Sequence, residues 1–140
     1  MTKMSRGLRN RNPGNIRLGG FRYKGEKRSS DTTFRQFESI EWGYRAMFVV
    51  LHTYAVKHNC NTLRKIITRY APPTENHTES YIRRVVDATH LSPDEAISTA
   101  NGAVMTAIVA AMSEVENGVK ANMEDVWQGW KLFIADFNPK

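Results

Sequence analysis

The stretch that decides the fold reads GAVMTAIVAAMSEVEN, residues 102–117. Apolar side chains recur on nearly every face of a helix built from these residues, which predicts a buried helix at the centre of the domain. Asn117 and Gly118 predict where this helix ends, because glycine readily adopts the left-handed conformation of a helix C-cap. We therefore expect the other elements to pack around residues 102–117.

Helical patterns flank this stretch on both sides. A last helix is predicted over about 123–136. Before residues 102–117, apolar spacing predicts a helix over 39–59 with Ser39 as its N-cap. A second predicted helix is capped by Asn61 and stopped by Ala71-Pro72-Pro73. A third starts at Thr74 or Thr78. Ser92-Pro93-Asp94-Glu95 predicts a further helix start, because a cap, a first-turn proline and a glutamate three residues after the cap coincide.

The first 38 residues lack helical periodicity and are rich in turn signals. Asn12-Pro13-Gly14-Asn15 predicts a turn, and residues 16–18 and 21–23 alternate apolar and basic side chains around Gly19-Gly20, which predicts a hairpin. Residues 33–37 predict a third short strand. The sequence thus predicts one mainly α (α+β) domain, residues 1–140, with a basic β-hairpin region (1–38) and a helical region (39–140).

Composition excludes several classes of protein. The chain has 140 residues, of which 41% are hydrophobic and 24% charged, as in an ordinary soluble globular domain and unlike a disordered or collagen-like chain. Its single cysteine, Cys60, excludes an internal disulfide and a multi-cysteine zinc site. The four histidines show no metal-ligand spacing, so we expect no metal and no cofactor. No apolar run approaches the roughly 20 residues of a membrane span, and no secretion signal follows the basic start.

The net charge of +6 is concentrated at the N-terminus. Residues 1–30 hold nine Lys and Arg and one acid, Glu26, whereas the other 110 residues hold eleven bases and thirteen acids. This distribution indicates either a polyanionic partner, such as nucleic acid, anionic lipid or a wall polymer, or simply a solvated basic loop region.

Glu116 is the first candidate for chemistry. Helical spacing places it on one stripe with Met112, Val109 and Met105, at the C-terminal end of the central helix. Burial and the negative end of the helix dipole should both raise its pKa. A carboxylic acid that stays protonated near neutral pH is what the general acid of a glycosidase requires. The alternative is a solvated glutamate at a frayed helix end.

Two polar segments are candidates for binding. In the segment from Tyr70 to Tyr81, the side chains of Glu75, Asn76 and Tyr81 could line a cleft and bind sugar hydroxyls or amides; the alternative is a capping loop between two helices. Asn12 and Asn15 suit recognition of carbonyl and N-acetyl groups, or they serve only a turn that leads into a strand.

These segments together resemble phage-encoded structural or virion-associated proteins that degrade peptidoglycan. The resemblance covers most of the chain in order and is carried by residues 9–17, 34–39, 43–46 and 62–78, by Ala107-Ile108, and by Glu116-Asn117-Gly118. A more distant similarity links the chain to flagellar-type glucosaminidases and other lysozyme-like enzymes. In those enzymes the helix that ends in the catalytic glutamate precedes an Asn-rich loop and hairpin, so the order here is that of a circular permutation.

The resemblance implies a lysozyme-like domain that cleaves the β-1,4 glycan strands of peptidoglycan, with Glu116 as the general acid facing the hairpin region and Tyr81 across the cleft. An inverting hydrolase needs a second carboxylate about 6.5–9.5 Å away, for which Glu26, Asp31 and Glu75 are candidates. A lytic transglycosylase needs Glu116 alone, acting first as acid and then as base, and we favour this scheme.

Other functions stay open at this point. The main alternative is a non-catalytic phage structural or cell-wall-binding module that keeps the cleft and performs no hydrolysis. Nucleic-acid binding is disfavoured, because no predicted helix carries a basic recognition face. The resemblance further implies synthesis in the host cytoplasm without a signal peptide, action on the bacterial cell wall, and association with other virion proteins.

Overall fold

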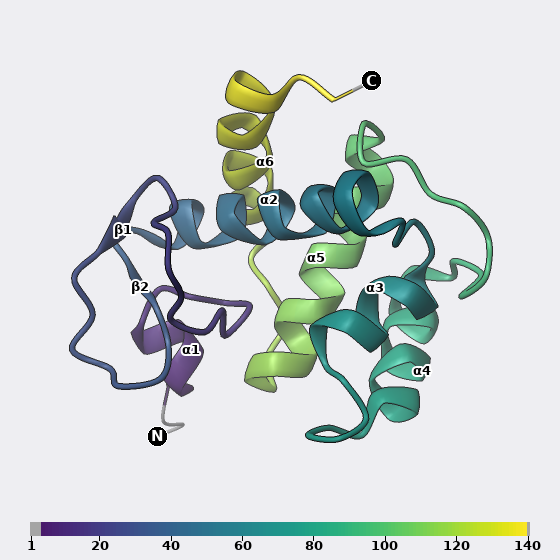
Figure 1. Cartoon of the computed structure of the whole chain (residues 1–140), viewed down its shortest axis with the longest axis horizontal. Helices are drawn as coiled ribbons and strands as arrows, with labels where there is room; N and C mark the ends of the chain where they lie inside the picture. The colour runs from purple at the N-terminus through teal and green to yellow at the C-terminus, as the bar shows by residue number, and fades with distance from the viewer. Residues whose placement is uncertain (1–3, 140) are drawn as a thin grey trace.

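A computed structural model describes residues 4–139 of the chain (Figure 1). The described part is mainly α-helical with one small antiparallel sheet, which confirms the predicted fold class. The elements in chain order are α1 (Arg6–Arg9), β1 (Glu26–Lys27), β2 (Gln36–Phe37), α2 (Ile40–His58), α3 (Leu63–Tyr70), α4 (Thr78–Thr89), α5 (Gly102–Asn117) and α6 (Met123–Phe137). The N-terminal region of residues 4–39, with α1, β1 and β2, lies at one side of the molecule; α3 and α4 lie at the other, and α2 runs between the two sides.

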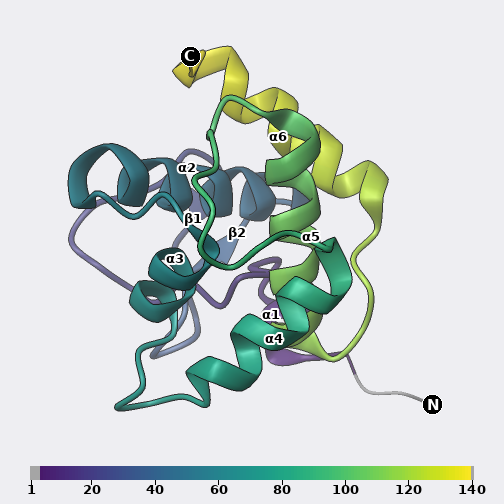
Figure 2. The ribbon, with the colours of Figure 1, turned by 90° about the vertical axis from the view of Figure 1, so that its right-hand side faces the viewer.

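Helix α5 is the centre of the structure, as its sequence predicts. It contacts α1, α2, α4 and α6, and Figure 2 shows α4 packed along it. Met105, Ile108, Val109 and Met112 are essentially inaccessible to solvent. Gly118 closes the helix with a φ of +75°, the left-handed C-cap expected from the sequence.

Helices α2 and α6 form the most extensive helix pair. A Cβ atom at Gly129 would lie 2.6 Å from the Cβ atom of Tyr44, so only glycine allows α6 to approach α2 this closely. The close approach brings Trp130 into edge contact with Phe48, with ring centroids 5.2 Å apart. Apolar burial of this kind stabilises a core by ~25 cal/mol per Å² of surface removed from water.

The helix boundaries differ from the predictions in two places. The N-cap of α3 is Thr62, whose hydroxyl accepts from the Lys65 amide at 3.2 Å, one residue after the predicted Asn61. The helix predicted at Ser92-Pro93-Asp94-Glu95 does not form. Instead Arg64 binds this segment, with its amide donating to the Pro93 carbonyl at 3.0 Å and its Nε to Asp94 at 2.8 Å. These contacts hold the segment as a turn against the start of α3.

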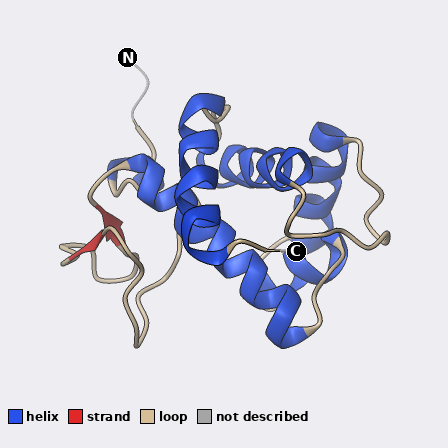
Figure 3. Cartoon of the chain, turned by 90° about the horizontal axis from the view of Figure 1, so that it is seen from above, coloured by secondary structure: helices blue, strands red, loops and turns tan. Residues whose placement is uncertain are grey.

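The sheet also forms with a pairing that differs from the predicted one. β1 and β2 pair antiparallel with Glu26 opposite Phe37, and Arg17 forms an isolated bridge with Phe34. The predicted hairpin between residues 16–18 and 21–23 is therefore wrong. The 16–18 segment pairs with the 33–35 segment instead, through hydrogen bonds such as Arg35 N to Ile16 O at 3.0 Å. Figure 3 shows the two strands at the end of the molecule, apart from the helical bundle.

Candidate active site

Glu116 lies in the last turn of α5 and is half-buried. Its Oε1 accepts a hydrogen bond from Nδ2 of Asn15 at 2.9 Å, and its Oε2 accepts one from the hydroxyl of Tyr81 at 3.0 Å. Asn15 comes from the N-terminal turn and Tyr81 from the first turn of α4. The structure therefore brings together three of the residues that the sequence singled out. Asn15 and Tyr81, two of the five residues predicted to bind sugar, hydrogen-bond Glu116 itself.

The surroundings of Glu116 favour the protonated acid. Burial raises its pKa, and the hydrogen bonds from Asn15 and Tyr81 offset this only in part. Burial, reinforced by the charge of Glu116, raises the pKa of both Tyr81 and Tyr70 well above its ordinary value, so these phenols stay protonated. A carboxyl group with a raised pKa beside two neutral phenols holds its proton to higher pH than a solvated glutamate does, as a general acid requires.

The side chain of Asn12 builds the turn that presents Asn15. Its Oδ1 accepts from the Ile16 amide, and its Nδ2 donates to the carbonyls of Ile16 and Arg35, each at 2.9 Å. Asn12 is fully buried and its polar atoms are used within the fold, which does not favour contact with substrate; that role stays a prediction. Asn15 follows with a φ of +50°, a left-handed conformation that asparagine tolerates better than most residues.

Asn117 and Tyr70 hold this turn against the helices. The sequence predicted a helix end at Asn117 but assigned neither residue a part in the site. Asn117 donates from Nδ2 to the carbonyl of Pro13 at 2.8 Å and accepts at Oδ1 from the Ser5 hydroxyl at 2.6 Å. The Tyr70 hydroxyl donates to the Gly14 carbonyl. The signal that could have found Asn117 is its place directly after Glu116, where an asparagine can bind loop carbonyls.

One polar atom of the site is unsatisfied. The Oδ1 of Asn15 is buried and, among the described residues, has no hydrogen-bond partner. A buried acceptor of this kind costs about 1–3 kcal/mol. Native structures tolerate such costs chiefly at positions where the arrangement serves another purpose, here the donation of Nδ2 to Glu116.

A groove of about 380 Å³ lies beside the neighbours of Glu116: Asn15 and Tyr70 line it, whereas Glu116 itself does not. Its wall on the N-terminal side consists of Asn15, Ile16, Arg17, Phe21, Tyr23 and Arg35. Its opposite wall comes from α2 and α3 and consists of Val50, Thr53, Tyr54 and Tyr70. Asn15 both lines the groove and hydrogen-bonds Glu116, and the charge of Glu116 influences Tyr70. The groove thus reaches the immediate neighbours of the carboxyl group.

Glu26, a predicted second carboxylate, is held inside the N-terminal region. It forms an ion pair with Arg35, and the two side chains are only 6% and 4% exposed. Its Oε1 also accepts from the Tyr23 amide at 3.1 Å. This arrangement gives Glu26 a structural role in the N-terminal region and does not favour it as the residue that activates water, so that role stays a prediction.

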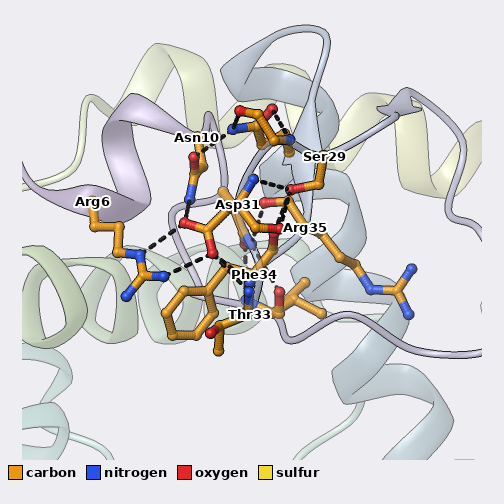
Figure 4. A network of polar contacts seen from close by, with 11 residues as sticks. Arg6, Asn10, Ser29, Asp31, Thr33, Phe34 and Arg35 are labelled. Atoms are coloured by element: carbon orange, nitrogen blue, oxygen red, sulfur yellow. Dashed lines mark hydrogen bonds and ion pairs between the residues drawn. The ribbon is translucent and has the colours of Figure 1, made fainter.

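Asp31 is likewise used by the fold (Figure 4). Arg6 binds both of its oxygens, at 2.7 and 2.8 Å, and Asn10 donates to Oδ2 at 3.1 Å. The amides of Thr33 and Phe34 donate to Oδ1. These donors hold the pKa of Asp31 far below its ordinary value. Asp31 therefore fixes α1 to the loop before β2; this does not favour it as a second catalytic carboxylate, and that role stays a prediction.

Glu75 and Asn76 lie on the exposed connector between α3 and α4. Asn76 donates to the Pro72 carbonyl at 3.3 Å. The Glu75 side chain makes no hydrogen bond or ion pair within residues 4–139. The connector precedes the helix that carries Tyr81, but the structure joins neither residue to Glu116. Their binding roles stay predictions.

Two further features concern metal ligands and membrane-spanning helices. Within residues 4–139, no three His, Cys, Asp or Glu side chains gather as metal ligands would. In that same part of the chain, every helix is too short or too polar to cross a membrane.

Comparison with known proteins supplies a relative. The chain is 38% identical to Protein P5 of the Pseudoalteromonas phage PM2 over 122 residues, which are 84% of this chain and 74% of the relative. The chain belongs to the family of Protein P5. This supports the phage origin that the sequence motifs predicted. No protein-family model matches the chain. The name Protein P5 states no activity, so the enzymatic function stays a prediction.

Proposed function

We propose that this member of the Protein P5 family cleaves the β-1,4 glycan strands of peptidoglycan, as a lytic transglycosylase whose single acid and base is Glu116. One observation carries the proposal: a half-buried carboxyl group with a raised pKa is bound by Asn15 and Tyr81, and Asn15 also lines a groove of about 380 Å³. Buried acids of this kind and grooves of this size are typical of active sites.

In the first step, Glu116 gives its proton to the glycosidic oxygen while the bond from that oxygen to C1 breaks. The amide nitrogen of Asn15 can only donate, whereas the Tyr81 hydroxyl can donate or accept. The proton of the acid form therefore sits on Oε2, beside Tyr81. The acetamido oxygen of the substrate bonds to C1 as the leaving group departs, which gives a cyclic oxazolinium ion beside the Glu116 carboxylate.

In the second step, the Glu116 carboxylate removes the proton from the C6 hydroxyl of the same sugar. The C6 oxygen then bonds to C1 and displaces the acetamido oxygen, which leaves a 1,6-anhydro end and restores the acid. Asn15 and Tyr81 both donate to the carboxylate between the steps, so they stabilise the charge that forms there.

The pairing of Glu26 with Arg35 and of Asp31 with Arg6 supports the single-glutamate scheme, because both carboxylates already bind an arginine within the N-terminal region. Glu75 is the one candidate of the three that is exposed. The phage relative supports a phage origin; association with a virion and action on the wall of a bacterial host are part of the proposal.

The test is release of soluble fragments from purified, dye-labelled peptidoglycan. We expect Glu116→Gln to abolish release and Glu114→Gln, a matched change two residues earlier on the same helix, to leave it near the wild-type rate. Glu75→Gln should also be active; if it fails as completely as Glu116→Gln, the enzyme is a two-carboxylate hydrolase. If the wild type binds the wall and releases nothing, the protein is a wall-binding module.

A further inference from the structure

We propose that the groove beside Glu116 binds the uncharged pyranose rings of an N-acetylated glycan, which stack on an aromatic wall built by Phe21 and Tyr23. This rests on the proposed function for the identity of the glycan. Neither residue stood out in the sequence as part of a site.

The first step of the argument is the exposure of Phe21. Its side chain is 62% exposed at the groove, although a large apolar side chain gains by burial. It contacts Tyr23 edge to face, with ring centroids 5.0 Å apart. Tyr23 in turn lies 6.4 Å from the ring of Phe37, which is fully buried. The exposed ring therefore stands at the end of a row of aromatic residues anchored in the core.

The second step is the rigidity of this wall. Arg35 lies beneath it, with its guanidinium carbon 4.8 Å from the Tyr23 ring centroid and 5.4 Å from that of Phe21. The same guanidinium donates to the backbone carbonyls of Arg17 and Phe21, at 2.8 and 2.6 Å. Gly19 passes so close to Arg35 that a Cβ atom there would lie 2.7 Å from Nη2. The loop is thus held in place before any ligand binds, which lowers the entropy cost of binding.

The third step is the charge of the groove. The ion pair with Glu26 neutralises Arg35. Arg17 is the other charged residue of the lining, and its guanidinium carbon lies 5.7 Å from the Phe34 ring centroid. The opposite wall offers the hydroxyl groups of Thr53 and Tyr54 and the apolar side chain of Val50. Aromatic faces and hydroxyl groups match the C–H faces and hydroxyl groups of a pyranose ring. Because the groove reaches Asn15, a ring that stacks on Phe21 belongs to the same strand that Glu116 would cut.

The experiment measures binding of the N-acetylglucosamine tetramer to the Glu116→Gln chain by calorimetry, so that no cleavage occurs. We expect Phe21→Ala in this background to weaken binding roughly fivefold, because one aromatic contact is lost. Phe21→Trp keeps a ring at the rim and should restore binding. Trp127→Ala, at a half-exposed aromatic residue of α6, is the matched control and should have no effect. Binding should be nearly independent of salt, because the ligand is neutral.

Equal affinity of Phe21→Ala and its parent overturns the inference, as does an equal loss in Trp127→Ala or the absence of measurable tetramer binding to every variant. The proposed function is tested separately by cleavage of the wall. If the tetramer binds through Phe21 while the wild type cleaves nothing, the stacking site stands and the transglycosylase does not. If the wild type cleaves and Phe21→Ala has an unchanged KM, the transglycosylase stands and the stacking site does not.

Discussion

Asn15 and Glu116 are 101 residues apart in the chain, and Nδ2 of the asparagine lies 2.9 Å from Oε1 of the glutamate. This hydrogen bond joins the N-terminal region to the end of the central helix. The bond favours the ionised carboxylate and therefore opposes the effect of burial on its pKa. The pKa of Glu116 is set by the balance of burial, which raises it, against the hydrogen bonds from Asn15 and Tyr81, which lower it.

Tyr81→Phe should shift the pH dependence of the reaction upward. The change removes the donor to Oε2 and keeps the ring, so the pKa of Glu116 should rise further. Because the acid must be protonated to act, activity is lost as pH rises through this pKa, and the loss should move to higher pH. The pH profile of kcat/KM on soluble glycan fragments measures it. A profile that coincides with that of the wild type contradicts the role given to Tyr81.

Glu116→Gln should stabilise the fold at neutral pH. The folded pKa of Glu116 is raised above its unfolded value, so the folded state binds more protons and the wild type loses stability as pH rises from the unfolded pKa through the folded one. The glutamine cannot ionise, and it can still accept from Asn15 and donate to the Tyr81 oxygen. The midpoint of urea unfolding, compared at acid and neutral pH, checks this. If the stability gained by Glu116→Gln over the wild type becomes smaller as pH rises, the prediction is wrong.

Asp31 should govern the acid stability of the N-terminal region. Its folded pKa is far below the unfolded value, so the stabilisation is present above the unfolded pKa of about 3.9 and is lost as pH falls toward the folded one. Hydrogen exchange at the Thr33 and Phe34 amides, which donate to Asp31, should quicken in Asp31→Asn already at neutral pH. Unchanged exchange at these two amides contradicts the structural role of Asp31.

Gly7→Ala should disrupt the site without touching Glu116. A Cβ atom there would lie 2.5 Å from Oδ1 of Asn117 and 2.8 Å from Oδ1 of Asn15. We expect it to cost about 1–3 kcal/mol of stability, as overpacking does, and to lower cleavage at least tenfold, because it displaces the partner of Glu116. Gly20→Ala, with nothing within 4 Å, is the control for both measurements. Similar activity in the two variants counts against a positioning role for the turn.

The sequence predicted the parts of the site that depend on local periodicity. Helical spacing alone placed Glu116 on the same stripe as Met112 and predicted the end of its helix at Asn117 and Gly118, and both features hold. The roles of Glu26 and Asp31 could not be read in this way, because they depend on Arg35 and Arg6. Such ion pairs join side chains that only the fold brings together.

The two errors in secondary structure have the same origin. The start signal at Ser92-Pro93 is favourable locally, but binding of the segment by Arg64 outweighs it. Alternation in residues 16–18 predicted a strand without naming its partner, and the partner is the 33–35 segment rather than the nearest apolar run. Local sequence patterns thus predicted most of the helices, and they did not predict how the short strands pair.

The central claim is that Glu116 alone supplies the acid and the base, and mass spectrometry of the fragments released from purified peptidoglycan tests it most directly. The wild type and Glu114→Gln should release muropeptides with 1,6-anhydro ends, and Glu116→Gln should release none while its circular dichroism spectrum matches that of the wild type. Anhydro fragments released by Glu116→Gln at the wild-type rate would contradict the claim.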